Sequence, residues 1–425
     1  MSANLKKRHL VALALLLTAF AFDAFAGDSF QTKGFARFRW GHSGNVGTNT
    51  VLDHTDLVVA PEFWFKPSAE VAVMLQPQYD QMMGNEKDLH AVAMGSSAGG
   101  VDTGLGAHQA FVSYSPNDRY KLTMGRQVVS LGDELLFGEG GWADNGKALS
   151  GLRFDASHSM GSAHIFAMTI QENEPFPVAS PYDRSLMGLY TTWKLAEEVK
   201  AFDVYYFMSK DPAGKAAGAG GTDISSMSVY GARIKAEKSG LDLRFEYTGE
   251  KNPNYVSAGG VLDTSGTQMN AELGYTMDGP MKIRVSGEYY DASKDFNQLL
   301  ANTHKWLGEN DLLGRRNISG MAGHVSVSPN ADWTFSAAYY MFNRKDAAAA
   351  AFMTDGTTAI GLGSANAEKA IATEIDLGAS YNVTKNMTFK VAYNITSYGN
   401  YIKNQNLFGG ATKGTGAAIW TEISF

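Results

Sequence analysis

Charged side chains alternate with apolar ones in several segments of this sequence, and this spacing places the charges on one face. Within residues 241–247, Arg244 lies between Asp242 and Glu246 on a polar face, and the residues between them are apolar. A guanidinium presents a planar fork of donors that suits a carboxylate, so a row of arginines would guide an anionic solute. Other segments of this kind contribute further basic residues: Arg37, Arg39, Arg153, Arg233, Lys235, Lys282 and Arg284.

The same arginines have a simpler interpretation, in which each pairs with a neighbouring carboxylate and only stiffens the surface it lies on. Arg153 is two residues from Asp155, and Arg284 is close to Glu288. Exposed ion pairs contribute little free energy, and many of them serve no function at all. The sequence alone leaves both interpretations open.

The elements that position these charges are strands, because the alternation has a period of two. Eighteen such segments, each of about ten residues, lie between Phe30 and Phe425. In the last of them Ile419, Thr421, Ile423 and Phe425 share one face. A terminal aromatic on an alternating strand resembles the closing strand of bacterial outer-membrane β-barrels.

The connections between the segments distinguish a barrel from a soluble β-sandwich, because short and long ones alternate along the whole chain. Transmembrane barrels have short periplasmic turns and longer extracellular loops. The short connections are residues 66–68, 115–118, 157–160, 194–198, 237–240, 277–280, 328–332 and 382–386. The long ones are residues 42–55, 81–105, 130–148, 171–183, 209–225, 251–266, 292–317, 343–370 and 398–414. The pattern predicts an all-β fold, a single transmembrane antiparallel barrel of eighteen strands.

The outward face of such a barrel must be apolar, because lipid offers no hydrogen bonds and a basic residue at the midplane costs about 2–4 kcal/mol. One strand conflicts with this rule. Leu122 and Met124 face outward, so strict alternation would place Arg126 in lipid. We therefore predict a β-bulge at Gly125 that turns Arg126 toward the lumen.

The N-terminal residues indicate that the protein is exported from the cytoplasm. Basic residues at 6–8 precede an apolar run at 10–22 and a small-residue cleavage site at 24–26, which is typical of a secretory signal peptide. We predict a signal peptide at residues 1–26, a barrel at residues 27–425 and a location in the bacterial outer membrane. The chain has no cysteine and a formal net charge of -7, which excludes a disulfide scaffold and a basic nucleic-acid surface.

The sequence gives little support for a catalytic site or a metal-binding site. The sequence Gly41-His42-Ser43-Gly44-Asn45 is superficially similar to a motif of outer-membrane phospholipases, but its spacing differs. No histidine pair has a metal-ligand spacing, so we expect no cofactor and no enzyme activity. Asp133 and Glu134 are adjacent and should point in opposite directions, so we expect them to bind a lumen arginine or a cation. The connection that contains them, residues 130–149, is rich in acidic and aromatic residues and is a candidate to fold over or into the lumen.

One region resembles a known family. Its blocks are residues 122–127, 132–134, Trp142, residues 145–146 and residues 151–153, with a second set at residues 296–299, His304, Gly308 and Asp311. They are similar to the signature of the alginate-export family of outer-membrane barrels. The resemblance implies an eighteen-strand barrel with an electropositive pore for an anionic polysaccharide, and it carries over Arg126, Asp133 and Arg153.

The chain departs from that signature at three positions. Leu135 stands where the family usually has arginine, Lys147 also replaces an arginine, and Ser150 replaces an aspartate. We therefore predict a passive porin of this type that conducts anionic sugars, oligosaccharides or small anions through a partly arginine-lined lumen. The alternatives are a general or cation-preferring porin, and an adhesin whose long loops are the working surface. The expected partners are outer-membrane lipid and anionic solutes, with no nucleic acid, and the sequence does not set the oligomeric state.

Overall fold

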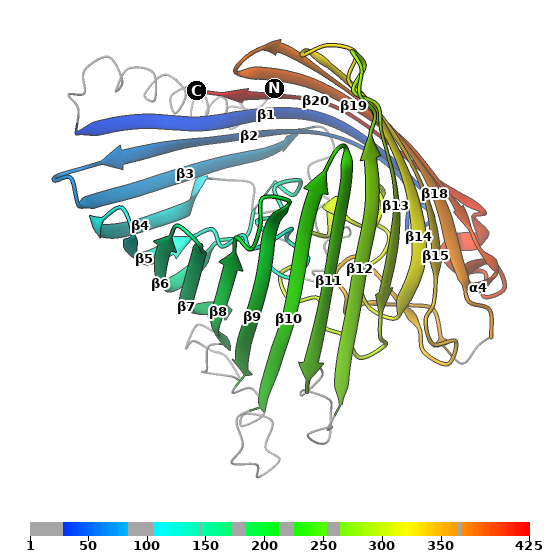
Figure 1. Ribbon diagram of the computed structural model, residues 1–425. Helices are drawn as coiled ribbons and strands as arrows, with labels where there is room; N and C mark the ends of the chain where they lie inside the picture. The colour runs from blue at the N-terminus through cyan, green and yellow to red at the C-terminus, as the bar shows by residue number, and fades with distance from the viewer. Residues whose placement is uncertain are drawn as a thin grey trace.

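The strands of this protein form one closed ring, in which neighbours along the chain pair antiparallel (Figure 1). The computed structural model describes residues 29–83, 105–144, 146–171, 184–211, 225–252, 264–363 and 367–425. The predicted signal peptide at residues 1–26 lies outside the described residues. Among those described, no helix has the length and apolarity needed to cross a membrane.

The ring contains eighteen strands, and the predicted number is confirmed. They are β1 (Phe30–Gly44), β2 (Val51–Phe65), β3 (Val71–Met83), β4 (Leu105–Asn117), β5 (Tyr120–Gln127), β6 (Leu149–His158), β7 (Gly161–Gln171), β8 (Arg184–Trp193), β9 (Val199–Asp211), β10 (Ser225–Lys238), β11 (Leu241–Lys251), β12 (Ser265–Thr276), β13 (Arg284–Ala292), β14 (Ile318–Val327), β15 (Trp333–Asn343), β18 (Ala370–Thr384), β19 (Met387–Tyr398) and β20 (Lys413–Ser424). A small hairpin of β16 (Ala351–Phe352) and β17 (Ala359–Ile360) forms a separate sheet. Short helices η1 (Thr303–Lys305), α4 (Asn400–Lys403) and η3 (Leu407–Gly410) complete the described elements.

The barrel closes because β1 pairs with β2 on one side and with β20 on the other. Phe38 is opposite Thr421 in this closing register, and the Phe425 backbone N–H donates to the Gly34 carbonyl at 3.1 Å. Closure leaves no unpaired sheet edge, which is the condition for a sheet to cross hydrocarbon.

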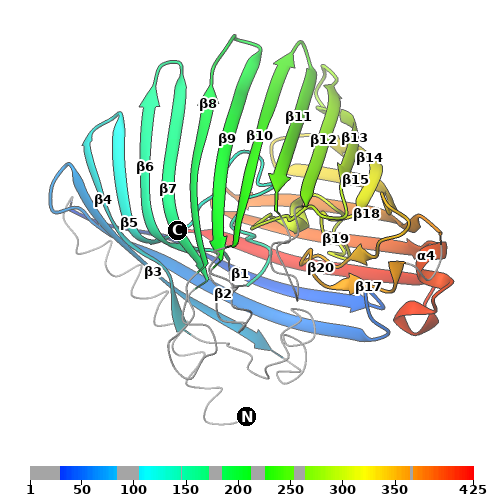
Figure 2. The ribbon, with the colours of Figure 1, turned by 90° about the horizontal axis from the view of Figure 1, so that it is seen from below.

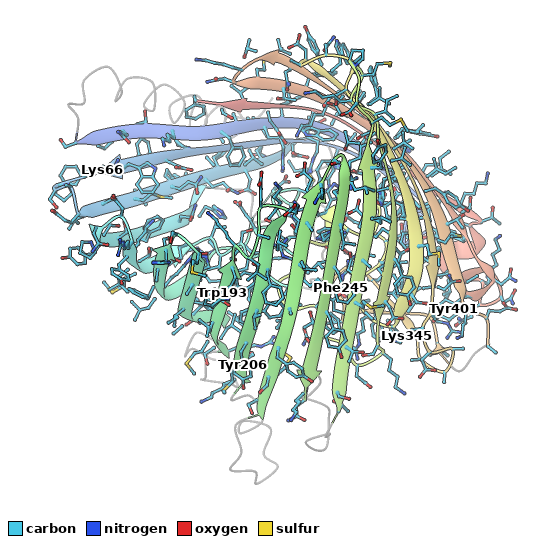
Figure 3. All side chains as sticks on the ribbon, in the orientation of Figure 1. Lys66, Trp193, Tyr206, Phe245, Lys345 and Tyr401 are labelled. Atoms are coloured by element: carbon cyan, nitrogen blue, oxygen red, sulfur yellow. The ribbon has the colours of Figure 1, made fainter. Side chains whose placement is uncertain are left out.

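The outer face of the strands is apolar, as the alternation predicts, whereas the inner face is polar on some strands and apolar where the wall carries buried residues such as Phe166 and Phe207. On β11, Leu241, Leu243, Phe245 and Tyr247 are all exposed, whereas Arg244 is buried inside. Figure 3 shows Phe245 of β11 and Tyr206 of β9 among the side chains on the barrel wall. Aromatic residues gather where strands meet the short connections, and Trp333 stacks on Tyr381 with ring centroids 4.6 Å apart.

All eight short connections lie within a few residues of their predicted places, and several long connections are shorter than predicted because the strands extend into them. The connection predicted at residues 42–55 is only residues 45–50, because β1 and β2 stay paired up to Gly44 and Val51. His42 bonds Asp53 across this extension, with Nδ1 and Oδ1 2.8 Å apart. Polar strand pairs are stable beyond the bilayer, where water solvates both faces, so the strands continue past their apolar part.

Candidate functional site

Two long connections fold into the barrel and narrow its lumen. Residues 128–148, which join β5 to β6, and residues 293–317, which join β13 to β14, lie within the ring of strands (Figure 2). We call them the first and second inward loops. Their apolar residues pack on inward side chains of the wall, and Phe137 contacts Phe166 and Phe207 at ring distances of 6.0 and 4.8 Å. The sequence left open whether the 130–149 segment folds over the lumen or into it, and its described residues lie inside the barrel.

The first inward loop binds the wall of β1 and β2 through Asp144. Arg37 Nη2 and Arg39 Nη2 donate to Asp144 Oδ1 at 2.8 and 3.0 Å. Arg39 Nε also donates to Asp56 Oδ2 of β2 at 2.8 Å. Both arginines are buried, with exposed fractions of 4% and 6%. They therefore act on the loop rather than on the open lumen.

The other end of the first inward loop binds β9 and β10. Arg233 donates through Nη1 to Asp133 at 2.5 Å and through Nε to Asp203 at 2.6 Å. The Tyr190 hydroxyl donates to the same Asp203 at 2.6 Å. Gly132, with a φ of 59°, lets the loop approach this tyrosine, because a Cβ there would lie 2.5 Å from the Tyr190 hydroxyl.

Glu134, next to Asp133, points the other way and joins the two inward loops. It accepts from Ser130 at 2.6 Å and from Asn302 Nδ2 at 2.8 Å. Burial opposes its ionisation, but these hydrogen bonds outweigh burial and lower the pKa of Glu134. The expectation that the adjacent carboxylates point apart and that one binds a lumen arginine agrees with this geometry.

The second inward loop binds the wall through Trp306 and meets the first loop along several contacts. The Arg244 guanidinium lies 4.1 Å from the centroid of the Trp306 ring, and Arg244 Nη2 pairs with Glu272 at 3.1 Å. Trp306 Nε1 donates to the Asp133 carbonyl at 3.1 Å. Lys147, at one of the positions where the chain departs from the family signature, donates through Nζ to the Ala301 carbonyl at 2.6 Å. Its ammonium therefore serves the loop contact, and burial lowers the pKa of Lys147.

Trp142 of the first inward loop contacts both the β1 wall and the second inward loop. The Arg39 guanidinium lies 4.3 Å from its ring centroid, and the His304 ring stacks on it at 4.2 Å and 3°. His304 in turn contacts Asp311 at 2.9 Å and Glu309 at 3.2 Å. Burial disfavours the imidazolium, but the two carboxylates outweigh it and raise the pKa of His304 to about 10. A cationic ring on an indole face is a favourable cation–π arrangement.

Arg153 and Arg284 differ from the other arginines, because their described contacts are all with the wall. Arg153 Nε donates to Asp155 at 2.7 Å, and Arg284 Nη2 donates to Asp242 at 2.5 Å and to Glu272 at 2.9 Å. Their side chains are 20% and 31% exposed, so they are accessible from the lumen.

Arg126 is not in the lumen, and the predicted bulge at Gly125 is wrong. Gly125 pairs in register with Phe111 and with Gly151, so Arg126 keeps the outward parity of Met124 and is exposed. The bulge is on β4, where His108 is skipped opposite Pro77.

The backbone carbonyl of His108 on β4 partly solvates the outward-facing guanidinium of Arg126. Proline has no N–H to offer the ladder, which explains why the pairing slips at Pro77. Arg126 Nε donates to the His108 carbonyl at 3.1 Å. This charge therefore belongs to the outer face.

The sequence did not single out Asp144, Trp306 or the Trp142–His304 contact as functional. Trp142, His304 and Asp311 were part of the family resemblance, but the resemblance did not indicate that Trp142 contacts Arg39 of β1 and His304 of the other loop. The available signal was the abundance of acidic and aromatic residues in residues 130–149. No group of three or more metal-ligand side chains occurs within the described part of the chain.

Comparison with known proteins agrees with this architecture. The family described as Alginate export matches residues 29–408 of this chain. The protein belongs to the alginate-export family. No curated protein matches the sequence.

Several solved structures share the fold. The OccK3 (OpdO) structure of Pseudomonas aeruginosa is 8% identical, with a TM-score of 0.59, and the match covers 94% of this chain and 96% of that one. OprD from the same organism is 12% identical, with a TM-score of 0.59 and 94% of each chain covered. OccK2 (OpdF), solved in complex with glucuronate, is 8% identical, with a TM-score of 0.55, and the match covers 93% and 96% of the two chains. The family match indicates an outer-membrane porin channel, and these likenesses show that the chain has the fold of other outer-membrane proteins.

Proposed function

We propose that this porin conducts small hydrophilic solutes by passive diffusion, and that carboxylates rather than a free arginine ladder set its selectivity. One observation supports this most strongly: each inward arginine of the predicted set forms an ion pair with a carboxylate. These arginines are Arg37, Arg39, Arg153, Arg233, Arg244 and Arg284.

A paired arginine attracts a polyanion only weakly, because the carboxylate cancels most of the electric field of the guanidinium beyond the pair. Selectivity then depends on charges that are left over. Arg233 pairs with both Asp133 and Asp203, and Arg284 pairs with Asp242 and with Glu272, which Arg244 shares. Glu139 and Glu309, on the two inward loops, contact His108 and His304, but they are 41% and 40% exposed and so also face the lumen water. This surplus of carboxylates favours a modest preference for cations.

The test is the reversal potential of single channels of the mature barrel in a planar bilayer under a potassium chloride gradient. We expect the sign that indicates cation preference, with an amplitude that shrinks at high salt as charges are screened. The opposite sign would contradict this selectivity while leaving the porin fold intact.

Conduction of anionic sugars is the second candidate, and the alginate-export family match favours it. The partly exposed Arg153 and Arg284 are the residues that would contact such a solute. Adding uronic acid oligomers to one side of the bilayer distinguishes the two candidates. Brief, concentration-dependent blocks of the current that weaken in Arg153→Gln would support the anionic substrate, and an unchanged current would exclude it.

A further inference from the structure

Two lysines lie on the outer face of the barrel near the extracellular ends of β9 and β11. Lys210 shares the outward parity of Tyr206, and Lys251 shares that of Tyr247. These tyrosines are 46% and 41% exposed, so this face is the one that meets lipid. Lys251 is itself exposed, and Lys210 is half-buried.

The strand between them supplies hydroxyl groups. Lys210 is opposite Ser226 of β10, and Lys251 is opposite Ser228 of the same strand. Both serines have the outward parity of Tyr230, and the Tyr206 hydroxyl donates to Ser228 Oγ at 3.3 Å. Because adjacent strands are about 4.8 Å apart, the two lysines flank a strip about 10 Å wide with hydroxyls at its centre.

The strip lies at the depth of lipid headgroups. Each lysine is four residues beyond its tyrosine, toward the long connections. Four residues span about 13 Å of strand, and a tilt of about 40° turns this into roughly 10 Å along the membrane normal. Tyrosines mark the edge of the hydrocarbon, so the ammonium groups reach the polar layer just outside it.

The charge of the strip has no partner within the part of the chain that the structure describes. Neither Lys210 nor Lys251 forms an ion pair there, and the outward neighbours Ser185 and Ser265 are uncharged. A lysine farther around the rim differs, because Lys345 (Figure 3) pairs with Asp291 of β13.

We propose that Lys210, Lys251 and the serines of β10 dock a phosphate group of a phosphorylated lipid in the outer leaflet. Two ammonium groups and two hydroxyls can surround the phosphate oxygens with charge-assisted hydrogen bonds, and the tyrosines below support the lipid's apolar part. The docked lipid would fix this side of the barrel at a defined depth in the membrane.

Native mass spectrometry of the whole barrel in mild detergent tests the proposal, with a phosphorylated disaccharide glycolipid and its dephosphorylated form as probes. We expect the phosphorylated probe to stay bound to the wild type. We expect the Lys210→Gln/Lys251→Gln variant to retain it about tenfold or more weakly, since each basic residue near a membrane surface contributes about fivefold to binding. The dephosphorylated probe should bind wild type and variant equally weakly.

The matched control is Lys194→Gln/Lys200→Gln, which removes two exposed lysines near a short periplasmic connection. It should retain the phosphorylated probe as the wild type does. Unchanged single-channel conductance in both double variants shows that the barrel is folded. Equal retention by the wild type and Lys210→Gln/Lys251→Gln overturns the proposal, and so does an equal loss in the control.

Discussion

The lumen arginines form two groups, and the difference between them indicates what each group does. Arg37, Arg39, Arg233 and Arg244 are almost fully buried and contact the inward loops. Arg153 and Arg284 are partly exposed, and their described ion pairs are with wall carboxylates. The first group therefore determines where the loops lie, and the second contributes to the electric field that a solute meets.

This comparison also explains why burial matters more than the number of arginines. A buried pair that loses one partner leaves an uncompensated charge in a poorly solvated site, which is strongly destabilising. A half-exposed pair that loses one partner is solvated by lumen water and changes mainly the local charge. Equivalent substitutions in the two groups should therefore give different results.

The largest effect is expected for Asp144→Ala, because it removes the carboxylate shared by Arg37 and Arg39. Breaking a buried pair of this kind costs about 3–5 kcal/mol, so the first inward loop should leave the β1 wall. Single-channel conductance should rise and become noisier. The matched control is Asp155→Ala, which removes the carboxylate partner of half-exposed Arg153 and should leave conductance close to that of the wild type. Equal effects of the two substitutions would remove the distinction between the groups.

A smaller and reversible effect is expected from alkaline pH through His304. Its pKa is raised to about 10 in the folded loop, from an ordinary value near 6.5. The stability gained from its charge is therefore fully present below about pH 6.5 and is lost as pH rises to about 10. Channel noise should increase as pH approaches 10 and recover on return to neutral pH. His304→Phe, which keeps an aromatic ring on Trp142 without a charge, should show no such step.

The half-exposed group should change selectivity rather than structure. Arg284→Gln removes the cation that pairs with Asp242 and leaves Glu272 paired with Arg244 alone, so the reversal potential should move by several millivolts toward cation preference. Conductance should stay nearly constant. Arg37→Gln is the matched comparison, because it also removes one positive charge. We expect it to alter the conductance and to change the selectivity less than Arg284→Gln does. A shift toward anion preference in Arg284→Gln would contradict this assignment.

The smallest effect is expected for Arg126→Leu. This arginine lies on the outer face, so neither selectivity nor conductance should change in the bilayer measurement. Stability should change by about 1 kcal/mol or less, since the charge lost from the lipid side is offset by the lost bond to the His108 carbonyl. A clear selectivity change would place Arg126 in the lumen after all.

The fold was predictable from the sequence because local signals determine it. The alternation of apolar and polar residues determines which side chains of each strand face lipid. Short connections such as the one containing Pro67 can be recognised from their turn-forming residues. The carboxylate partner of Arg153 was also predictable, since Asp155 is two residues away. The partner of Arg284 was not, because the sequence suggested Glu288 of its own strand, whereas Arg284 pairs with Glu272 of β12 and Asp242 of β11. The failure at Arg126 came from placing the bulge on its own strand, whereas Pro77 was the signal for a bulge on β4.

The inward loops were harder to predict, because their contacts join residues far apart in the chain. Asp144 reaches Arg37 across 107 positions, and Trp306 reaches the Asp133 carbonyl across 173. No local pattern encodes such pairs. The sequence could indicate that an acidic, aromatic segment would enter the lumen, but not which arginine it would bind.

A cross-link between the two inward loops tests most directly whether they meet inside the conducting barrel. Phe137 and Leu300 form an isolated β-bridge, and neighbouring strand positions are within the reach of a disulfide. The chain has no cysteine of its own, so Phe137→Cys/Leu300→Cys introduces a single pair. We predict that the pair oxidises readily and that single-channel conductance is the same before and after reduction. Failure to cross-link, or a several-fold rise in conductance on reduction, would contradict the account.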